Sequence, residues 1–257
     1  MPSDKPLLRV AGLDKSFSGV TAVDGVSITV PRGELVGVLG PNGAGKSTLF
    51  HLIAGHLRSD AGDIELDGQR INALPPHRRA RLGIGLVFQT PRLFAGMTVL
   101  DNVMAGQFLR GRGGMLTAAF RMPPHYRYER VAAAASRELL ARLHLEAYAG
   151  TEISGLPFGI QRRVALAQAL GVGHELLLLD EPAAGLTGGE RHELRQLIGE
   201  LRASGQSILL IEHDVGFVAA IADTLVVLDR GRVLAQGDVT SVLADPAVKT
   251  AYSGVSA

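Results

Sequence analysis

The chain of 257 residues contains no cysteine. It can therefore form neither disulfides nor thiolate metal sites, which fits the reducing environment of the cytosol. Its 26 Lys and Arg residues nearly balance its 25 Asp and Glu residues, giving a net charge of +1. Because the positive and negative charges are nearly equal in number, the chain has no overall electrostatic field that would attract nucleic acid. We expect no nucleic-acid partner.

Long apolar segments are also absent. No run of about 18 apolar residues occurs, and the best candidate, 217–228, is short and interrupted by Asp223. The N-terminus, Met1 to Pro6, lacks the apolar core of a signal peptide. We therefore expect a chain that does not span a membrane, although partners can hold it on one.

One segment of the chain contains a complete phosphate-binding motif. Residues 40–48 match the phosphate-binding pattern G-x-x-x-x-G-K-[ST], and they lie between the apolar run 35–39 and a helical segment. Glycines let successive N–H groups converge on a phosphate at a helix N-terminus. We expect Lys46 to contact the β- and γ-phosphates of a nucleotide and the Ser47 hydroxyl to bind Mg²⁺. The predicted nucleotide-binding residues are Gly40, Pro41, Asn42, Gly43, Ala44, Gly45, Lys46, Ser47 and Thr48.

The rest of the chain is typical of an α/β fold. Alternating residues over 7–35 predict antiparallel strands, and residues 93–172 contain no strand-like run. Further strands are predicted at 63–68, 85–88, 176–180, 207–211 and 225–228, and helices at 75–81, 128–145 and 189–203. Several of these strands are short continuous apolar runs, which suit a parallel sheet that is covered on both faces. We expect a nucleotide-binding core with an α-helical insertion.

Two acids follow the apolar run 176–179. In open α/β sheets, ligands bind at the carboxyl ends of the strands. Asp180 is predicted to hold Mg²⁺, directly or through water, together with Ser47. Glu181 is placed to accept a proton from the water that attacks the γ-phosphate. Acids are common at strand ends, so this interpretation depends on the phosphate loop upstream.

Gln89 and His213 also follow predicted strands. Alone, His213 would more often be a structural hydrogen-bonding residue, and Gln89 would be unremarkable. In a sheet that binds phosphate, His213 is predicted to contact the γ-phosphate or the attacking water, and the Gln89 amide to reach Mg²⁺ or that water. The predicted catalytic residues are Lys46, Gln89, Glu181 and His213, and the predicted Mg²⁺ ligands are Ser47, Gln89 and Asp180.

The order of these motifs resembles the ATPase subunit of an ABC transporter over nearly the whole chain. The motifs are 40–48, Gln89, 156–163, 176–181 and His213. The resemblance implies that Phe17 stacks on adenine, that Gln89 starts the loop that senses the membrane subunits, and that ATP lies at a head-to-tail dimer interface.

The same resemblance implies one ABC ATPase domain over residues 1–257. Its α/β core would be a P-loop NTPase core of the RecA type, joined to an antiparallel β subdomain, over about 1–92 and 173–257. An α-helical subdomain would occupy about 93–172.

Several shorter segments of the chain resemble the corresponding segments in the ATPases of branched-chain amino-acid importers. They are 21–26, 81–85, 88–89, 92–94, 97–99, 180–186, 245–248 and 251–254. Such subunits pair with each other, with two permeases and with an extracytoplasmic substrate-binding protein. The resemblance therefore implies a peripheral place on the cytoplasmic face of the inner membrane. Related importers carry urea, amides or other hydrophobic amino acids.

Two other functions stay open. Soluble ABC ATPases act in translation or cluster assembly, but the translation factors usually join two cassettes and this chain has one. A phosphate-loop kinase would not need Gln89, the signature segment and His213 in this order.

Residues 107–129 resemble an insertion of one of the two importer ATPases. The segment 107–130 contains one acid, Glu129, and the basic residues Arg110, Arg112, Arg121, Arg127 and Arg130. It is interpreted either as a solvated mobile loop or as a face against permease loops or anionic lipid headgroups.

The signature segment departs from the family pattern L-S-G-G-Q. It comprises Leu156, Pro157, Phe158, Gly159 and Ile160. Pro157 removes a hydroxyl and a backbone N–H, and Ile160 replaces an amide with a hydrocarbon. Thr187 stands where an acid or amide is usual. Because this segment would act on the partner's ATP, we expect either two unequal ATP sites or a sufficient contribution from Gly159 and the helix N-terminus.

Overall fold

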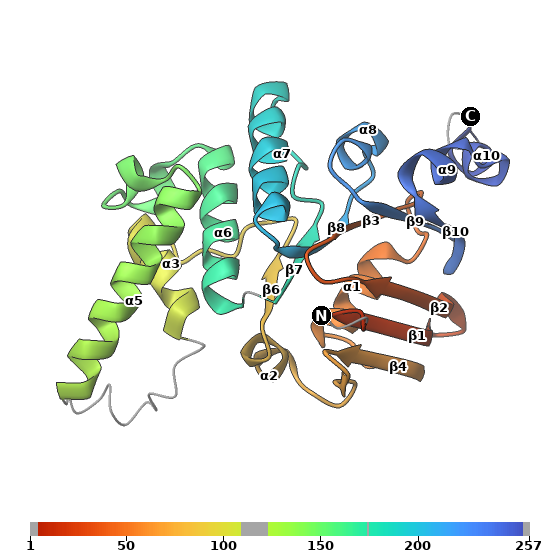
Figure 1. The fold of residues 1–257 in the computed structure, drawn as a ribbon, viewed down its shortest axis with the longest axis horizontal. Coiled ribbons are helices and arrows are strands. Elements are labelled where there is room, and N and C mark those ends of the chain that lie inside the picture. The colour runs from red at the N-terminus through yellow and green to blue at the C-terminus, as the bar shows by residue number, and fades with distance from the viewer. Residues whose placement is uncertain (1–4, 109–122, 174, 254–257) are drawn as a thin grey trace.

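The structure, a computed structural model, describes residues 5–108, 123–173 and 175–253 (Figure 1). The strands are β1 (Leu8–Phe17), β2 (Val20–Val30), β3 (Leu35–Leu39), β4 (Ala61–Leu66), β5 (Gln69–Arg70), β6 (Ile84–Val87), β7 (Leu176–Asp180), β8 (Ser207–Ile211), β9 (Thr224–Asp229) and β10 (Arg232–Asp238). The helices are α1 (Lys46–Ala54), α2 (Pro76–Arg81), α3 (Val99–Phe108), α5 (Pro123–Arg142), α6 (Phe158–Val172), α7 (Gly188–Ala203), α8 (Val215–Ala219), α9 (Val239–Ala244), α10 (Pro246–Ser253) and the short 3-10 helices η1 (Glu146–Tyr148) and η2 (Ile153–Gly155). Among the described residues, every helix is too short or too polar to span a bilayer.

The smaller of the two sheets has the strand order β2-β1-β4-β5, and each neighbouring pair in it is antiparallel. This confirms the antiparallel strands predicted over 7–35. The strand and turn predicted at 63–68 are both found: β4 ends at Leu66, and the turn follows it. The strand ends there because Asp67 and Gly68 have positive φ angles, 51° and 75°, and turn the chain into β5.

The larger sheet has the order β10-β9-β3-β8-β7-β6. All of its neighbouring pairs are parallel except β10 with β9. Strands β3, β7 and β8 are buried along their whole length, as continuous apolar runs predict for strands covered on both faces. The predicted α/β fold class is therefore confirmed.

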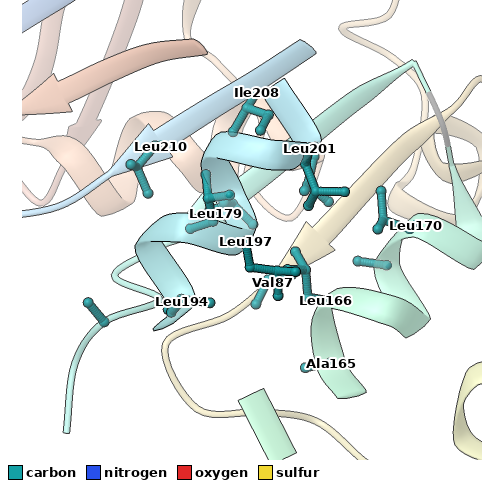
Figure 2. Packing of buried hydrophobic residues seen from close by; sticks show 14 of the residues in the cluster. Val87, Ala165, Leu166, Leu170, Leu179, Leu194, Leu197, Leu201, Ile208 and Leu210 are labelled. Atoms are coloured by element: carbon teal, nitrogen blue, oxygen red, sulfur yellow. The ribbon is translucent and has the colours of Figure 1, made fainter. Parts of the chain in front are cut away.

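Two hydrophobic cores lie on opposite faces of the larger sheet. Along β7, Leu177 and Leu179 belong to one core and Leu176 and Leu178 to the other, because side chains alternate between the faces of a strand. The first core is covered by α6 and α7, and Figure 2 shows Leu179 beside Leu197 of α7. The second core lies between this sheet, α1 and the smaller sheet.

Helices α3, α5 and α6 pack together at one end of the molecule (Figure 1). In the described part of residues 93–172, a single bridge between Thr98 and Glu152 is the only strand-like pairing, so this segment is helical as predicted. The helix predicted at 128–145 ends at Arg142, because His144 has a φ of 53° and begins a left-handed turn. The subdomain boundaries near 93 and 172 stay predictions.

Candidate nucleotide-binding site

The phosphate loop 40–48 joins the end of β3 to α1, as predicted. Gly45 is the N-cap of α1 with a φ of 100°, and a Cβ there would lie 2.3 Å from the carbonyl oxygen of Ala22. Gly40 has a φ of 154°, and its Cβ would lie 2.3 Å from the carbonyl oxygen of Leu228. Both positions therefore require glycine, which lets the loop pass close to two neighbouring backbones.

A cavity of about 320 Å³ opens beside this loop. Its lining residues are Ala22, Asn42, Gly43, Gly45, Lys46, Ser47, Thr48 and Glu181. The structure thus brings most of the predicted nucleotide-binding residues to one cavity, together with the predicted base. Ala44 does not line it: its side chain is buried in the core on the α1 face, and its carbonyl oxygen accepts a hydrogen bond from the Gly231 N–H at 3.0 Å.

Lys46 is almost fully buried, with 5% of its surface exposed. Its Nζ donates to the carbonyl oxygens of Gly40 at 2.8 Å and Pro41 at 3.0 Å. Burial lowers the pKa of Lys46, while Glu181, Asp180 and Glu212 oppose that change. The ammonium group is therefore held at the loop by two carbonyls and compensated by nearby acids.

Asp180 and Glu181 lie at the carboxyl end of β7. Burial raises the pKa of Asp180 to about 6, with Glu181 adding to the rise and Lys46 opposing it. Glu181 has a φ of 43°, which is costly for a residue with a side chain. Its N–H donates to the carbonyl oxygen of Ile211 at 2.8 Å, which helps to hold this conformation.

Replacing Asp180 with Asn is expected to stabilise the nucleotide-free protein at neutral pH. The folded-state pKa of about 6 lies above the ordinary value of 3.8. The ionised carboxylate therefore destabilises the fold as the pH rises through that window, by on the order of 3 kcal/mol. Loss of one acid that compensates Lys46 reduces the gain. Thermal unfolding should show a Tm that is a few degrees higher at neutral pH.

The same comparison at about pH 4, where the carboxyl group is mostly protonated in the folded protein, is the control. The Tm difference between the two proteins should shrink there. An equal difference at both pH values would contradict the titration of Asp180 as its cause.

Gln89 and His213 approach one carboxylate from neighbouring strand ends. Gln89 Nε2 donates to Glu181 Oε2 at 3.1 Å, and His213 Nδ1 lies 3.6 Å from the same oxygen. The two residues follow β6 and β8, which flank β7 in the sheet. The structure therefore gathers three predicted catalytic side chains at Glu181 Oε2, and Lys46 lines the same cavity as Glu181.

Most of the chain, from within β2 to the turn that follows β7, matches a known protein family. A family model described as ABC transporter covers residues 23–184. The chain belongs to the ABC transporter family. As an ABC ATPase, it binds ATP and hydrolyses it to drive transport.

Individual proteins match this ABC ATPase over nearly its whole length. BraF, a high-affinity branched-chain amino acid transport ATP-binding protein of Pseudomonas aeruginosa, is 38% identical over 97% of this chain and 98% of BraF. LptB, the lipopolysaccharide export system ATP-binding protein of Acidithiobacillus ferridurans, is 38% identical over 96% of this chain and 97% of LptB. The solved structure of MJ1267, an ATP-binding cassette of an ABC transporter in its ADP conformation, is 31% identical with a TM-score of 0.83, over 97% of this chain and 99% of MJ1267.

Phe17 of this ABC ATPase lies at the end of β1 and is exposed. The Lys15 ammonium group lies 5.3 Å from the centroid of its ring. Phe17 is not among the residues that line the cavity beside the phosphate loop. Its stacking on adenine therefore stays a prediction.

The signature segment begins α6 and does not line that cavity. Pro157 is the N-cap of α6, with no side-chain cap, and its carbonyl oxygen accepts hydrogen bonds from the N–H groups of Ile160 and Gln161. Leu156 and Ile160 are half-buried, whereas Phe158 is exposed. Pro157 therefore offers no side-chain acceptor to the first N–H groups of α6, and it has no N–H of its own to donate to a ligand.

Thr187, predicted as a departure from the family pattern, caps α7. Its hydroxyl accepts a hydrogen bond from the Glu190 N–H, and the Glu190 side chain accepts one from the Thr187 N–H. This reciprocal capping box gives the residue a structural role in this chain.

Two buried charged residues of the site were not predicted. Glu212, directly before His213, and Arg162, on α6, are each 1% exposed. The available signal for Glu212 was its place after the apolar run 207–211, at the same sheet edge as Asp180. Arg162 gave no comparable signal, since charged residues on helices usually face solvent.

Most of the basic segment 107–130 is outside the described residues. Arg110, Arg112 and Arg121 lie there, and only the backbone of Arg127 is described. Arg130 is exposed on α5. Both interpretations of the segment therefore stay open.

Proposed function

We propose that this ABC ATPase is the energy-coupling subunit of an importer for branched-chain or other hydrophobic amino acids. The observation that carries the proposal is the match to BraF over 97% of the chain. The motifs at 81–85, 92–94, 97–99 and 180–186 support the same substrate class. LptB matches at the same identity, so an ATPase of lipopolysaccharide export is a second candidate.

In the proposed reaction, the phosphates of ATP bind at the phosphate loop. Lys46 Nζ already lies at the loop and would exchange its two carbonyl acceptors for β- and γ-phosphate oxygens. Glu181 accepts the proton of the attacking water, because its carboxylate lines the same cavity. Gln89 and His213 flank that carboxylate and hold the water and the γ-phosphate in place.

Ser47, Gln89 and Asp180 are the proposed Mg²⁺ ligands. They offer hydroxyl, amide and carboxylate oxygens, the hard donors that Mg²⁺ prefers. Among the described residues there is no group of three or more His, Cys, Asp and Glu side chains that could hold a metal. Mg²⁺ usually combines one or two carboxylates with substrate phosphates and water, and this donor set contains one carboxylate, that of Asp180. The ion would neutralise charge on the β- and γ-phosphates.

We propose that this chain works in a head-to-tail pair with a second ABC ATPase, identical or different. The signature segment lies outside the chain's own cavity, which supports a role at the partner's ATP. Two permeases and, indirectly, an extracytoplasmic substrate-binding protein complete the assembly at the cytoplasmic face of the inner membrane. ATP closes the pair, closure moves the permeases through the region of Gln89, and hydrolysis resets it.

A second cavity, of about 260 Å³, supports the proposed permease contact. It is lined by His51, His56, Leu57, Phe88 and Arg92, beside the start of the Gln89 loop. The Arg92 guanidinium lies 4.4 Å from the centroid of the Phe88 ring. Burial, and then neighbouring positive charge, lower the pKa values of His51 and His56. Both changes favour the neutral imidazoles, so Arg92 supplies the positive charge of this cavity.

Extraction of the tagged chain from membranes in mild detergent is expected to recover two permeases with it. Arg92→Ala should reduce that recovery by about tenfold, because it removes the charged side chain that lines the proposed contact. ATP binding should be unchanged, since Arg92 does not line the nucleotide cavity. Arg9→Ala, at an exposed arginine of β1, is the matched control and should retain the permeases.

Recovery of the chain from the soluble fraction without any membrane protein would contradict this proposal and favour a soluble ABC ATPase. The reconstituted complex then separates the transport candidates. ATP hydrolysis that rises with leucine and its binding protein supports import of amino acids, whereas hydrolysis that rises with lipopolysaccharide supports the second candidate.

A further inference from the structure

One buried side chain of the signature helix holds the backbone of two catalytic loops. Arg162 donates from Nη1 to the carbonyl oxygens of Phe88 at 2.9 Å and Gln89 at 2.6 Å, and from Nη2 to that of Ala184 at 3.1 Å. The first two carbonyls belong to the loop that carries the Gln89 amide. The third belongs to the turn that follows Glu181. The planar guanidinium is suited to this, because it presents several donors in fixed directions.

Glu212 holds the same turn from the other side. Its Oε1 accepts a hydrogen bond from the Ala183 N–H at 2.9 Å, next to the carbonyl of Ala184 that Arg162 holds. A carboxylate therefore binds the donor of the peptide group that joins residues 182 and 183, and a guanidinium binds the acceptor of the one that joins residues 184 and 185. Burial lowers the pKa of Arg162, and Glu212 opposes that change. Burial raises the pKa of Glu212, and the hydrogen bond from the Ala183 N–H opposes that rise.

The turn between these two charges contains the strained residue of the site. Glu181, with its φ of 43°, closes the turn through its carbonyl oxygen, which accepts from the Ala184 N–H at 3.1 Å. Its carboxylate meets the Gln89 amide at 3.1 Å. Arg162 binds the backbone beside both residues of that contact, so its three hydrogen bonds fix the distance between them. Strained backbone persists only where surrounding contacts hold it.

Arg162 also touches the signature segment. Its guanidinium lies 4.9 Å from the centroid of the Phe158 ring, which is exposed at the start of α6. A Cβ at Gly185, in the turn after Glu181, would lie 3.5 Å from the same ring. A movement of the signature segment therefore reaches both loops through one side chain.

We propose that Arg162 and Glu212 are positioning residues for ATP hydrolysis, which clamp the turn after Glu181 and align Glu181 with Gln89. Through its contact with Phe158, Arg162 links this alignment to the segment that meets the partner's ATP. The inference rests on the proposed roles of Glu181 and Gln89. It assigns neither Arg162 nor Glu212 a contact with ATP.

The first test is Arg162→Lys in the full chain, measured by steady-state ATP hydrolysis. Lysine keeps the charge but cannot reach three carbonyls on two loops. We expect kcat to fall by about 10- to 100-fold, because small misalignments of catalytic groups are costly, and KM for ATP to change by less than about threefold. Arg142→Lys is the matched control: Arg142 is an exposed arginine at the end of α5 that donates to the Ser204 hydroxyl, so kcat should stay at the wild-type value.

A second set of variants separates positioning from folding. Arg162→Gln breaks three hydrogen bonds and leaves Glu212 as a buried charge, so it should lower Tm. Glu212→Gln removes a carboxylate whose pKa burial raises, so it should lower Tm less. The double variant should recover part of that loss, because both charges are gone. Its kcat should stay low, since the three carbonyls have still lost their donor. Recovery of kcat together with Tm, or a wild-type kcat in Arg162→Lys, would overturn the proposal.

The parallel variant Glu181→Gln keeps the two proposals distinguishable. Turnover that persists in Glu181→Gln refutes the assigned base, whatever the Arg162 variants do. Turnover that is lost in Glu181→Gln and unchanged in Arg162→Lys refutes the positioning role alone.

Discussion

The Glu181→Gln variant is expected to bind ATP at least as tightly as the wild-type protein and to hydrolyse it about 10²–10⁴-fold more slowly. Glutamine has the same shape and can still accept the hydrogen bond from Gln89. It cannot accept the proton of the attacking water. Removing a negative charge from the cavity also reduces its repulsion of the γ-phosphate, so affinity should not fall.

Binding of a fluorescent ATP analogue and release of inorganic phosphate measure the two properties separately. Glu175→Gln is the matched control, because Glu175 directly precedes β7 at the opposite end of the strand and is exposed. It should behave as the wild-type protein does in both assays. Hydrolysis near the wild-type rate in Glu181→Gln would refute the assigned base, and equal loss of binding and hydrolysis would point to damage of the cavity.

Much of the core could be predicted because its strands are short runs of apolar residues. The run 176–180 is buried at every position, and a run of that kind can form only where both faces of a sheet are covered. Strand β10 was not predicted, since it is a half-exposed edge strand of mixed composition. The available signal was the turn at Arg230 and Gly231, whose positive φ angles of 46° and 81° join β9 to β10.

The candidate site could be predicted at the level of residues, and less so at the level of contacts. Strand order places Gln89, Glu181 and His213 at one edge of the sheet. A sequence does not reveal that the side chains of Gln89 and His213 both approach Glu181 Oε2. The burial of Arg162 was beyond sequence reasoning for a physical reason. It arises because two loops, more than 70 residues away and 22 residues away along the chain, present carbonyls to the same helix.

Restoring the family pattern with Pro157→Ser and Ile160→Gln is expected to speed hydrolysis of the ATP that the partner subunit holds. Each donor aimed at developing phosphate charge contributes about 10²–10³ in rate by analogy with oxyanion donors, so a gain of about 10²-fold is expected. The serine would return a hydroxyl and an N–H at the N-cap of α6. Hydrolysis of the ATP held at this chain's own phosphate loop should change little, because in the proposed head-to-tail pair the partner's signature segment would complete that site.

The alternative to unequal ATP sites is that Gly159 and the N-terminus of α6 already provide enough hydrogen-bond donors for the partner's ATP. A contact in the structure opposes it. The Glu190 carboxylate lies beside Gly159, since a Cβ at Gly159 would lie 2.5 Å from Glu190 Oε1, and hydrogen bonds from Thr187 and then from Gly159 lower the pKa of Glu190. A phosphate would have to displace a negative charge to reach Gly159. With Pro157 lacking its N–H, the signature segment offers the partner's ATP fewer free donors than the family pattern provides.

The expected difference in hydrolysis rate between the two ATP sites can be tested by trapping nucleotide in the assembled complex. Cross-linking then shows which subunit holds the trapped nucleotide. Pro246→Ser, the same substitution at the start of α10, is the control and should leave both sites unchanged. Equal turnover at the two sites of a wild-type heteromeric pair would refute the asymmetry. In a homodimer both sites would carry the same Pro157, so total hydrolysis would rise in the double variant. The pattern of trapping therefore separates unequal sites in a mixed pair from equally slow sites in a pair of identical chains.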